Sequence, residues 1–501
     1  MKECSLLAPL FAIPPFTLLP PELLRRLCGP VLGIVQLILE FHRSAVTARA
    51  SLDFEQRLSD LLREVGRCIV ECVYNDCEPQ DHNMLPRQIE FEEVWYQRIN
   101  RKSANRKVAT LFGTITLMRF LYRPIEETVP GIFPLEIRLG LEAARATPAL
   151  ADRIGQYAAQ CTQQTVLQIL RRDHGVNWSV GLLRKVTAAV AAGMAEHRHE
   201  AQVAKLLKLL EQAFASRGNR LPVLAAGRDG IFAPLRKLGK FLGYCEAAVA
   251  TVSVYDRRGD RLGTVFLGRM PEEGQCALSN QLTLLIKDVL KRRTGALPRL
   301  AYVTDAGKQQ TAYFKKVLRR MRHPRTGERL RWEWVVDYYH ACQYITKMAE
   351  ALFGEGRAAQ AWAAKMRRWL KHKPRGIHRV LHSAAALRQR RGLTGLAGAF
   401  DKAYNYLSKR IRYLDYPDYR RRHLPIGSGV TEACCKTVFT QRMKQSGMSW
   451  GIESGQAIVD LRVVYLSLTW EATRDAYLRS KDVQTLRTQL DNHQKQHAKA
   501  A

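Results

Sequence analysis

The segment between residues 221 and 340 constrains the fold most, because its hydrophobic pattern changes several times between strand-like and helix-like. Alternating or β-branched apolar runs predict strands, and apolar residues spaced three or four apart predict helices. In chain order the segment predicts strands at 221–230 and on both sides of a turn in 246–268, and then a helix at 274–293. A strand in 299–307 that ends in Asp305, a helix at 308–321 and a strand in 331–340 that ends in Asp337 and runs into a helix follow. The late strands are joined through helices, so we expect them to pair in parallel. The predicted fold class is therefore α/β, with a mixed sheet flanked by helices.

The N-terminal half reads as mainly helical. Residues 51–74 are amphipathic at helical spacing, whereas 107–123 are rich in β-branched and aromatic residues and predict a short hairpin. Residues 150–194 predict two helices separated by "DHGVNWS", with Ser179 as the N-cap of the second. Such a pair is either a helix–turn–helix that places a helix in a major groove or a helical hairpin that only packs, and both interpretations stay open.

Charge indicates the partner. The chain has 79 Lys and Arg against 46 Asp and Glu, a net charge of +33, which favours a polyanion such as DNA. The basic stretches, such as 315–331 and 365–379, are interleaved with apolar or aromatic residues, which is typical of a folded basic surface. A membrane surface or a ribosome is an alternative use of such charge. No run of about 18 apolar residues is present, and the cysteines contain no Cys-x-x-Cys, so we expect a cytoplasmic protein without a membrane span.

Three aspartates follow or end predicted strands: Asp229, Asp305 and Asp337. Ligand sites of open parallel sheets form at this edge, and neighbouring strands are about 4.8 Å apart. Aspartates on adjacent strands can therefore share one or two divalent ions, and hard carboxylate oxygens suit Mg²⁺ or Mn²⁺. Taken singly, an Asp before Gly more often serves a turn or a cap.

A fourth acid, Glu432, stands in "GSGVTEACCKTVFTQRM" (427–443), where a glycine turn is expected to open a final long helix. A carboxylate in a first helical turn can simply complement the helix dipole. The alternative is that the turn directs Glu432 at the strand ends, while Lys436, Arg442 and Lys444 attract phosphate.

The order Asp229, Asp305, Glu432 on this pattern resembles the DDE transposases of the RNase H-like fold. The amino-acid sequence is most similar to the Kra-type group of bacterial insertion-sequence transposases, over roughly residues 90–470. The similar stretches are "GSGVTEACCKTVFTQRMKQSGMSW", "FPLEIRLGLEAARATPALADRI", "TLFGTITLMRFLYR" and "GRDGIFAPLR".

This resemblance implies a transposase that cleaves DNA at the ends of an insertion sequence and transfers the freed strand to a target. Asp229, Asp305 and Glu432 would be the catalytic triad and would bind two Mg²⁺ or Mn²⁺ ions. The partners would be double-stranded DNA, namely terminal inverted repeats and target DNA, and further copies of the chain in a dimer or larger synaptic complex. The location would be the cytoplasm of a bacterium, at the nucleoid.

Two further groups are expected near the site. "DYYHACQY" is similar to the Asp-x-x-His element of Mutator-like transposases, so Asp337 and His340 would support the site or bind DNA, unless they are a helix cap and a packed histidine. Arg367, Arg368 and Lys371 are candidate DNA contacts in a helical insertion, whose Trp362 and Trp369 either stack on a base or belong to the core.

The resemblance and the patterns together predict six regions. They are an N-terminal extension (1–50), a helical and hairpin region (51–147), a helix–turn–helix-like DNA-binding region (148–216), an RNase H-like catalytic domain (217–340 plus 426–470), an all-α insertion (341–425) and a C-terminal tail (471–501). Two other functions stay open: a metal-dependent DNA nuclease on the same fold, and a non-catalytic, domesticated DNA-binding protein.

Overall fold

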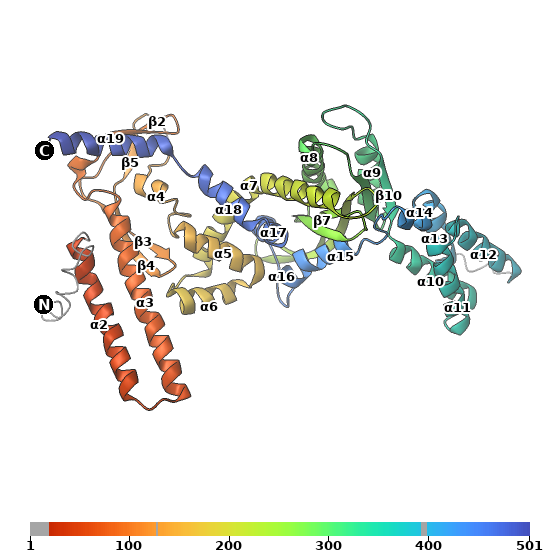
Figure 1. The fold of residues 1–501 in the computed structure, drawn as a ribbon, viewed down its shortest axis with the longest axis horizontal. Helices are drawn as coiled ribbons and strands as arrows, with labels where there is room; N and C mark the ends of the chain where they lie inside the picture. Colours follow the sequence, from red (N-terminus) through yellow and green to blue (C-terminus); the bar gives the residue numbers. More distant parts are fainter. Residues whose placement is uncertain (1–19, 127–128, 392–397, 501) are drawn as a thin grey trace. The chain divides into compact units, whose positions relative to one another are not determined.

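The computed structural model describes residues 20–126, 129–391 and 398–500 (Figure 1). The chain forms two compact units, the N-terminal unit (residues 1–193 with 474–501) and the central unit (residues 194–473). The junctions fall inside two helices, α7 (Val180–Ala215) and α18 (Trp470–Ser480). The C-terminal tail therefore belongs to the same unit as the N-terminal region.

The N-terminal unit combines helices with two small antiparallel sheets, β1-β2-β5 and β3-β4. Its elements are α2 (Pro21–Arg43), α3 (Ala48–Asp76), a 3-10 turn (His82–Met84), β1 (Gln88–Phe91), β2 (Val94–Arg98), β3 (Ala104–Thr110), β4 (Gly113–Arg119), β5 (Tyr122–Pro124), α4 (Pro134–Arg138), α5 (Pro148–Gln160), α6 (Gln163–His174) and α19 (Gln484–Ala500). Leu486 and Leu490 of α19 pack into the core of the first sheet with Ile89, Tyr96 and Tyr122. The tail thus completes a hydrophobic core that starts about 400 residues earlier.

The structure confirms the helix predicted at 51–74, which lies within α3, and the hairpin predicted at 107–123, which is β3-β4. Residues 150–194 differ from the prediction, because they form three helical segments. The extra break follows α5, where Thr162 accepts a hydrogen bond from the Thr165 N–H at 3.1 Å and caps α6. Ser179 accepts one from the Leu182 N–H at 3.3 Å, as expected of an N-cap.

The central unit is built on a five-stranded mixed sheet of order β10-β9-β6-β7-β8. Strands β10, β9 and β6 pair in parallel, and β6, β7 and β8 pair antiparallel. The sheet elements are β6 (Val223–Lys237), β7 (Lys240–Tyr255), β8 (Arg261–Arg269), a 3-10 turn (Glu273–Gln275), α8 (Cys276–Arg292), β9 (Arg299–Thr304), α9 (Lys308–Lys316), a 3-10 turn (Leu318–Arg320) and β10 (Trp332–Val336). The predicted α/β class, the element order and the parallel late strands are confirmed.

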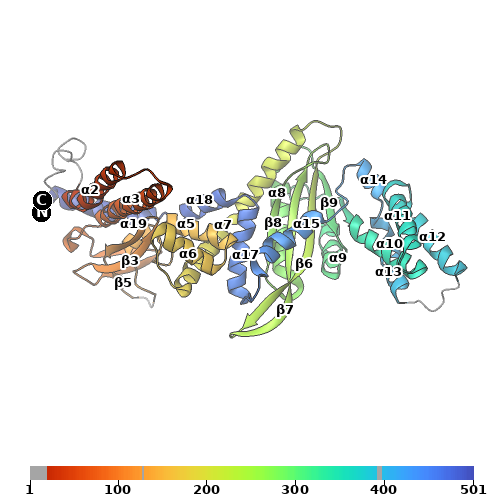
Figure 2. The ribbon, with the colours of Figure 1, turned by 90° about the horizontal axis from the view of Figure 1, so that it is seen from below.

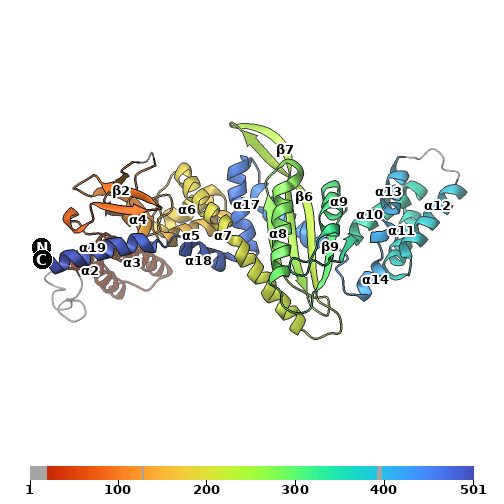
Figure 3. The same ribbon diagram turned by 90° about the horizontal axis from the view of Figure 1, so that it is seen from above.

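Helices cover both faces of this sheet, and adjacent residues of β6 identify them. A Cβ on Gly227 would lie 2.1 Å from Oγ1 of Thr431, in α15 (Gly429–Cys434). The next residue, Arg228, donates to Oγ of Ser279 in α8 at 2.9 Å. Successive side chains of a strand point to opposite faces, so α15 and α8 lie on opposite sides of the sheet (Figures 2 and 3).

Residues 341–425 form helices, as predicted, throughout the part that the structure describes. They are α10 (Tyr338–Phe353), α11 (Arg357–His372), α12 (Gly376–Arg390), α13 (Ala399–Ser408), a 3-10 turn (Ile411–Tyr413) and α14 (Tyr416–Arg421). Buried residues of these helices, among them Tyr416 and Leu407, belong to the same hydrophobic core as the sheet. The insertion is therefore packed onto the sheet and is not a separate appendage.

Two expectations about helix and strand ends were wrong. Asp229 does not end its strand, because β6 continues beyond it in antiparallel pairing with β7. The helix that opens near Gly427 is also not one long helix. It comprises α15, a π-helical segment (Cys435–Thr440) and α16 (Gln441–Met443), and α17 (Ile452–Leu466) follows only after a break that contains Gly447 at φ 74°.

The described part of the chain holds no helix that is both long enough and apolar enough to cross a membrane.

Candidate carboxylate centre

Three predicted acids lie in one row across the parallel strands. Gly227 pairs with Val303, so Asp229 within β6 and Asp305 just after the end of β9 occupy equivalent positions, each two residues further along the chain. Val336 pairs with Thr304, which places Asp337 opposite Asp305 on the other side. The Asp337 N–H donates to the carbonyl oxygen of Thr304 at 2.8 Å and continues this register. The sheet therefore brings Asp229, Asp305 and Asp337 to one line of its edge.

Close packing sets α15 on the sheet beside Asp229. Oγ1 of Thr431 lies 2.8 Å from Oγ1 of Thr251 on β7, and both side chains are buried. Gly227 leaves the space that Thr431 occupies. One turn further along the helix, the Cys435 thiol lies 3.4 Å from Oδ2 of Asp229. Glu432 follows Thr431 directly, so these contacts fix the backbone from which its exposed side chain projects.

The pKa of Asp229 is affected by the charges of the other acids. Burial raises the pKa of Asp229 most, and the charges of Asp305 and Glu432 raise it further, to about 6. A hydrogen bond from the Gly230 N–H at 2.8 Å opposes this shift. Burial and the neighbouring Asp229 also raise the pKa of the Cys435 thiol. The thiol therefore stays protonated and can donate to the carboxylate.

Asp337 links the sheet to the start of α15. It is 1% exposed, caps α10 by accepting the His340 N–H at 2.7 Å, and accepts from both the N–H and the hydroxyl of Ser428. Oγ of Ser428 also lies 2.9 Å from Oε1 of Glu432. Asp337 thus acts on the loop that carries Glu432, in addition to its cap role.

His340 packs against tyrosines. Its ring makes edge contacts with Tyr344 and Tyr406, at centroid distances of 5.2 and 5.6 Å, and these two tyrosines stack on each other at 3.8 Å. Of the two interpretations of His340, this geometry favours the packed histidine.

The same tyrosines connect the helical insertion to the loop of Asp305. The Tyr406 hydroxyl donates to the carbonyl oxygen of Asp305, and Arg410 donates to that of Ala306 at 3.0 Å. Ala306 has a φ of 62°, and Oδ1 of Asp305 accepts the Gly307 N–H at 3.0 Å. The loop is therefore held in an unusual conformation by residues about 100 positions away in the chain.

The predicted DNA-contacting cations have unequal access to solvent. Lys436 and Arg368 are exposed, whereas Lys444, Arg367 and Lys371 are half-buried. Arg442 is 1% exposed and lies 5.3 Å from the ring of Trp450, so in this structure its side chain is buried, and its assignment as a phosphate contact stays a prediction. The helix turns this side chain into the protein, and a sequence pattern does not show which face of a short helix is covered.

Three of the singled-out basic and aromatic residues of the insertion make packing contacts. Arg367 donates to Oγ1 of Thr346, and the ammonium of Lys371 lies 5.3 Å from the ring of Tyr338. Trp362 is buried and donates to Oγ of Ser383 at 3.1 Å, which supports the core interpretation for this tryptophan.

The donor set fits hard divalent cations by its chemistry, since the mutual repulsion of the acids around Asp229 is what a bound cation would relieve. In the part of the chain that the structure describes, however, no three His, Cys, Asp or Glu side chains are arranged to hold one ion. Oε1 of Glu432 is instead directed to Ser428.

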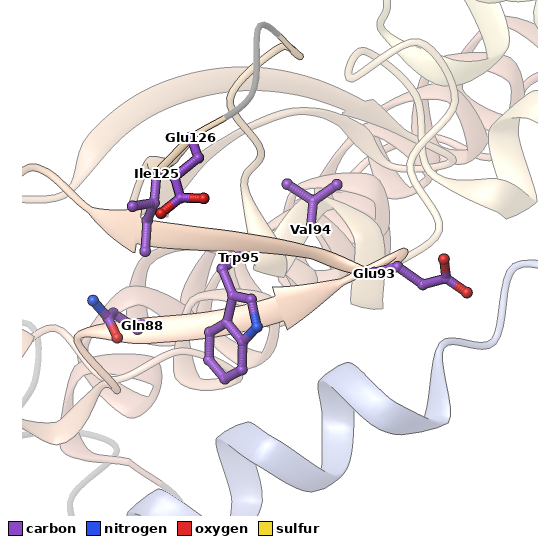
Figure 4. A pocket seen from close by; sticks show the side chains of 6 residues that line it. All are labelled: Gln88, Glu93, Val94, Trp95, Ile125 and Glu126. Atoms are coloured by element: carbon purple, nitrogen blue, oxygen red, sulfur yellow. The ribbon is translucent and has the colours of Figure 1, made fainter.

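A separate hollow of about 390 Å³ lies in the N-terminal unit (Figure 4). Its lining residues are Gln88, Glu93, Val94, Trp95, Ile125 and Glu126. None of the predicted site residues lines it.

Four residues that contact the site were not predicted from the sequence: Ser428, Cys435, Tyr406 and Arg410. Ser428 and Cys435 belong to the segment of Glu432, and the i to i+4 spacing of Ser428 and Glu432 was a usable signal. Nothing local distinguishes Tyr406 and Arg410. Comparison with known proteins adds no assignment, because no protein-family model and no curated protein matches the chain.

Proposed function

We propose that this chain is a DDE transposase that catalyses metal-dependent cleavage and transfer of DNA strands at the ends of a bacterial insertion sequence. The observation that carries the proposal is the position of Asp229 and Asp305 at equivalent points of two parallel strands, with Glu432 close enough to raise the pKa of Asp229. The order of the sheet, with parallel strands added on one side of β6 and antiparallel strands on the other, supports an RNase H-like assignment for the central unit.

Asp229, Asp305 and Glu432 would hold two Mg²⁺ or Mn²⁺ ions, which when bound supply Lewis-acid activation of the attacking oxygen and stabilisation of the leaving oxygen. The protein's part is to place these carboxylates. Burial and the Cys435 thiol restrain Asp229, Tyr406 and Arg410 restrain the Asp305 loop, and Ser428 restrains Glu432. The exposed Lys436 and the half-buried Lys444 follow Glu432 and would bind phosphates of the DNA.

The net charge of +33 supports nucleic acid as the substrate. Cutting and joining both ends of an element together would require a dimer or a larger assembly of this chain. A nuclease would use the same carboxylates with water as the only nucleophile. A non-catalytic DNA-binding protein would not need all three acids.

Cleavage and strand transfer with a labelled duplex of the element's own end, in Mg²⁺ or Mn²⁺, test the proposal. Wild type is expected to cut and join, whereas Glu432→Gln and Asp305→Asn bind the duplex and do neither. Glu453→Gln is the matched control, because Glu453 is likewise an exposed acid in a first helical turn, that of α17, and complements only the helix dipole. Cutting without joining supports the nuclease. Binding without any reaction of wild type supports the non-catalytic protein.

A further inference from the structure

Strands β6 and β7 continue past the carboxylates as a two-stranded arm (residues 231–246), in which Ala233, Pro234 and Leu235 are buried and most other side chains are at least partly exposed. Beyond Asp229, β6 extends by eight residues to Lys237 and returns through a two-residue turn, Leu238 and Gly239. At about 3.3 Å per residue the arm is roughly 25 Å long. Figures 2 and 3 show the hairpin projecting beyond the other strands of the sheet. A long hairpin that projects with exposed apolar side chains presents a surface for a partner.

One face of the arm carries a row of exposed aromatic rings. Phe232, Phe241 and Tyr244 are 59%, 60% and 61% exposed. Pro234 pairs with Tyr244 and Arg236 with Phe241, which puts the three rings on the face of Phe232. The rings of Phe241 and Tyr244 meet edge to face at 5.9 Å. Phe241 and Tyr244 therefore lie together, and more than half of each of the three side chains is exposed.

Cations accompany the rings. The arm contains Arg236, Lys237 and Lys240 against the single acid Glu246, and the ammonium of Lys444 lies 5.9 Å from the ring of Tyr244. Two such arms would repel each other, which disfavours a second copy of the chain as the partner. A row of aromatic rings flanked by cations is instead what binds single-stranded nucleic acid, since the rings stack on bases and the cations contact phosphates.

The outer half of the arm, at Pro234 and Arg236, is bonded to the segment that follows Glu432. Trp450 accepts a hydrogen bond from the Arg236 N–H at 2.9 Å and donates its own N–H to the carbonyl oxygen of Pro234 at 3.0 Å. Its indole N–H donates to the carbonyl oxygen of Met443 in α16 at 2.9 Å. The arm and the helical segments that begin at α15 are thereby joined, so the aromatic row has a defined position in the central unit.

The tip is also arranged for contact. Leu238 is 95% exposed, so its apolar side chain does not contribute to the core. Its φ of 49° is uncommon for a bulky residue. We propose that the β6–β7 arm is a binding platform for unpaired DNA bases, which stack on Phe241, Tyr244 and Phe232. The proposal rests on the proposed function in one respect: the unpaired strand would be the one opened at the end of the element.

Binding of labelled oligothymidine to the full chain, without divalent metal, tests this platform. Stacking contributes about 1–3 kcal/mol per base, so the double change Phe241→Ala with Tyr244→Ala is expected to weaken binding by about tenfold or more. Phe241→Tyr with Tyr244→Phe keeps the rings and should bind as wild type does. Leu284→Ala is the control, because Leu284 is a comparably exposed (52%) apolar residue on α8 of the same unit.

The salt dependence separates the rings from the cations. The double alanine change at the rings should leave the slope of log K against log salt unchanged, whereas Lys237→Ala with Lys240→Ala should lower it by about 1.4. Wild-type affinity of the ring variant, at an unchanged melting temperature, would refute the platform. So would sedimentation showing that wild type is a dimer and the ring variant a monomer, because the arm would then bind a second copy.

The outcome is independent of the cleavage assay. If wild type binds oligothymidine through the rings and does not cleave DNA, the platform stands and the proposed function fails. If wild type cleaves and joins DNA while the ring variant keeps full affinity, the platform fails and the proposed function stands.

Discussion

The hydroxyl oxygen of Ser428 lies 2.7 Å from Oδ2 of Asp337, and both residues are buried although 91 positions separate them in the chain. The same hydroxyl lies 2.9 Å from Oε1 of Glu432. Asp337, which follows the edge strand β10, thus restrains the start of the helix that carries Glu432. This connection gives Asp337 a definite role that does not require it to bind a metal.

Ser428→Ala and Asp337→Ala should lower the free energy of unfolding by different amounts. Ser428→Ala leaves Asp337 its two backbone N–H donors and should lower the free energy of unfolding by about 1 kcal/mol. Asp337→Ala also removes the cap of α10 and leaves buried donors unpaired, so a loss of about 3 kcal/mol or more is expected. Urea unfolding measures both. Ser454→Ala is the control, because the Ser454 hydroxyl is exposed and bonds only the nearby Gly451 carbonyl. Equal losses at Ser428 and Asp337 would contradict the connection.

Gly227→Ala should displace the helix that carries Glu432. The new Cβ would lie 2.1 Å from Oγ1 of Thr431 and 2.9 Å from Oγ1 of Thr251, so α15 must move away from the sheet. Overpacking of this kind costs about 1–3 kcal/mol, and strand cleavage should fall with it. Gly429→Ala is the matched control on the same helix, because a Cβ there meets nothing within 4 Å. Thermal melting and cleavage rates test the pair, and full activity of Gly227→Ala would be inconsistent with the packing described.

Tyr406→Phe should weaken the hold of the insertion on the Asp305 loop. The change removes only the hydroxyl that donates to the Asp305 carbonyl, so we expect a loss of about 1 kcal/mol of stability. A purely structural role would change stability alone. A positioning role would also raise the Mg²⁺ concentration needed for half-maximal cleavage. Tyr404→Phe, on the same helix α13, is the control. If Tyr406→Phe needs the same Mg²⁺ concentration as wild type, the contact of Tyr406 with Asp305 does not position the site.

The raised pKa of Asp229 predicts a stability that falls as the pH rises. The folded chain holds a proton on Asp229 up to about pH 6, whereas in the unfolded chain this carboxyl titrates near its ordinary value of 3.8. Between these values the folded state binds more protons, so raising the pH through this window lowers the free energy of unfolding, by about 3 kcal/mol in total. Asp229→Asn lacks this penalty.

Urea unfolding of wild type and Asp229→Asn, without divalent cations, measures the difference. Near pH 7.5 the variant should be the more stable protein, and below pH 4 the difference should disappear. Mg²⁺ at pH 7.5 should stabilise wild type more than the variant, because it offsets the repulsion among the acids. A difference that is independent of pH would exclude Asp229 as its source.

Much of the central unit followed from local patterns. Strand and helix periodicity in residues 221–340 predicted the element order. The end of each apolar run predicted Asp305 and Asp337 at the ends of strands, and they lie immediately after β9 and β10. The C-terminal end of β6 could not be predicted from its own sequence. Its continuation past Asp229 depends on pairing with β7, which extends as far as the pair Lys237 and Lys240. Neither Gly427 nor Gly429 has a positive φ, so the backbone before Glu432 does not use the left-handed conformation that glycine allows.

The sequence alone determined the chemistry that this chain carries: the acids, the large positive charge and the α/β order, all of which depend on residue type and short-range spacing. Only the tertiary structure decided which of these groups meet. The alignment of Asp229 with Asp305, the contact of Tyr406 with the Asp305 loop and the burial of Arg442 depend on strand register and on the covered face of a helix. These are set by packing between segments far apart in the chain, and such packing leaves little trace in the local pattern of any one of them.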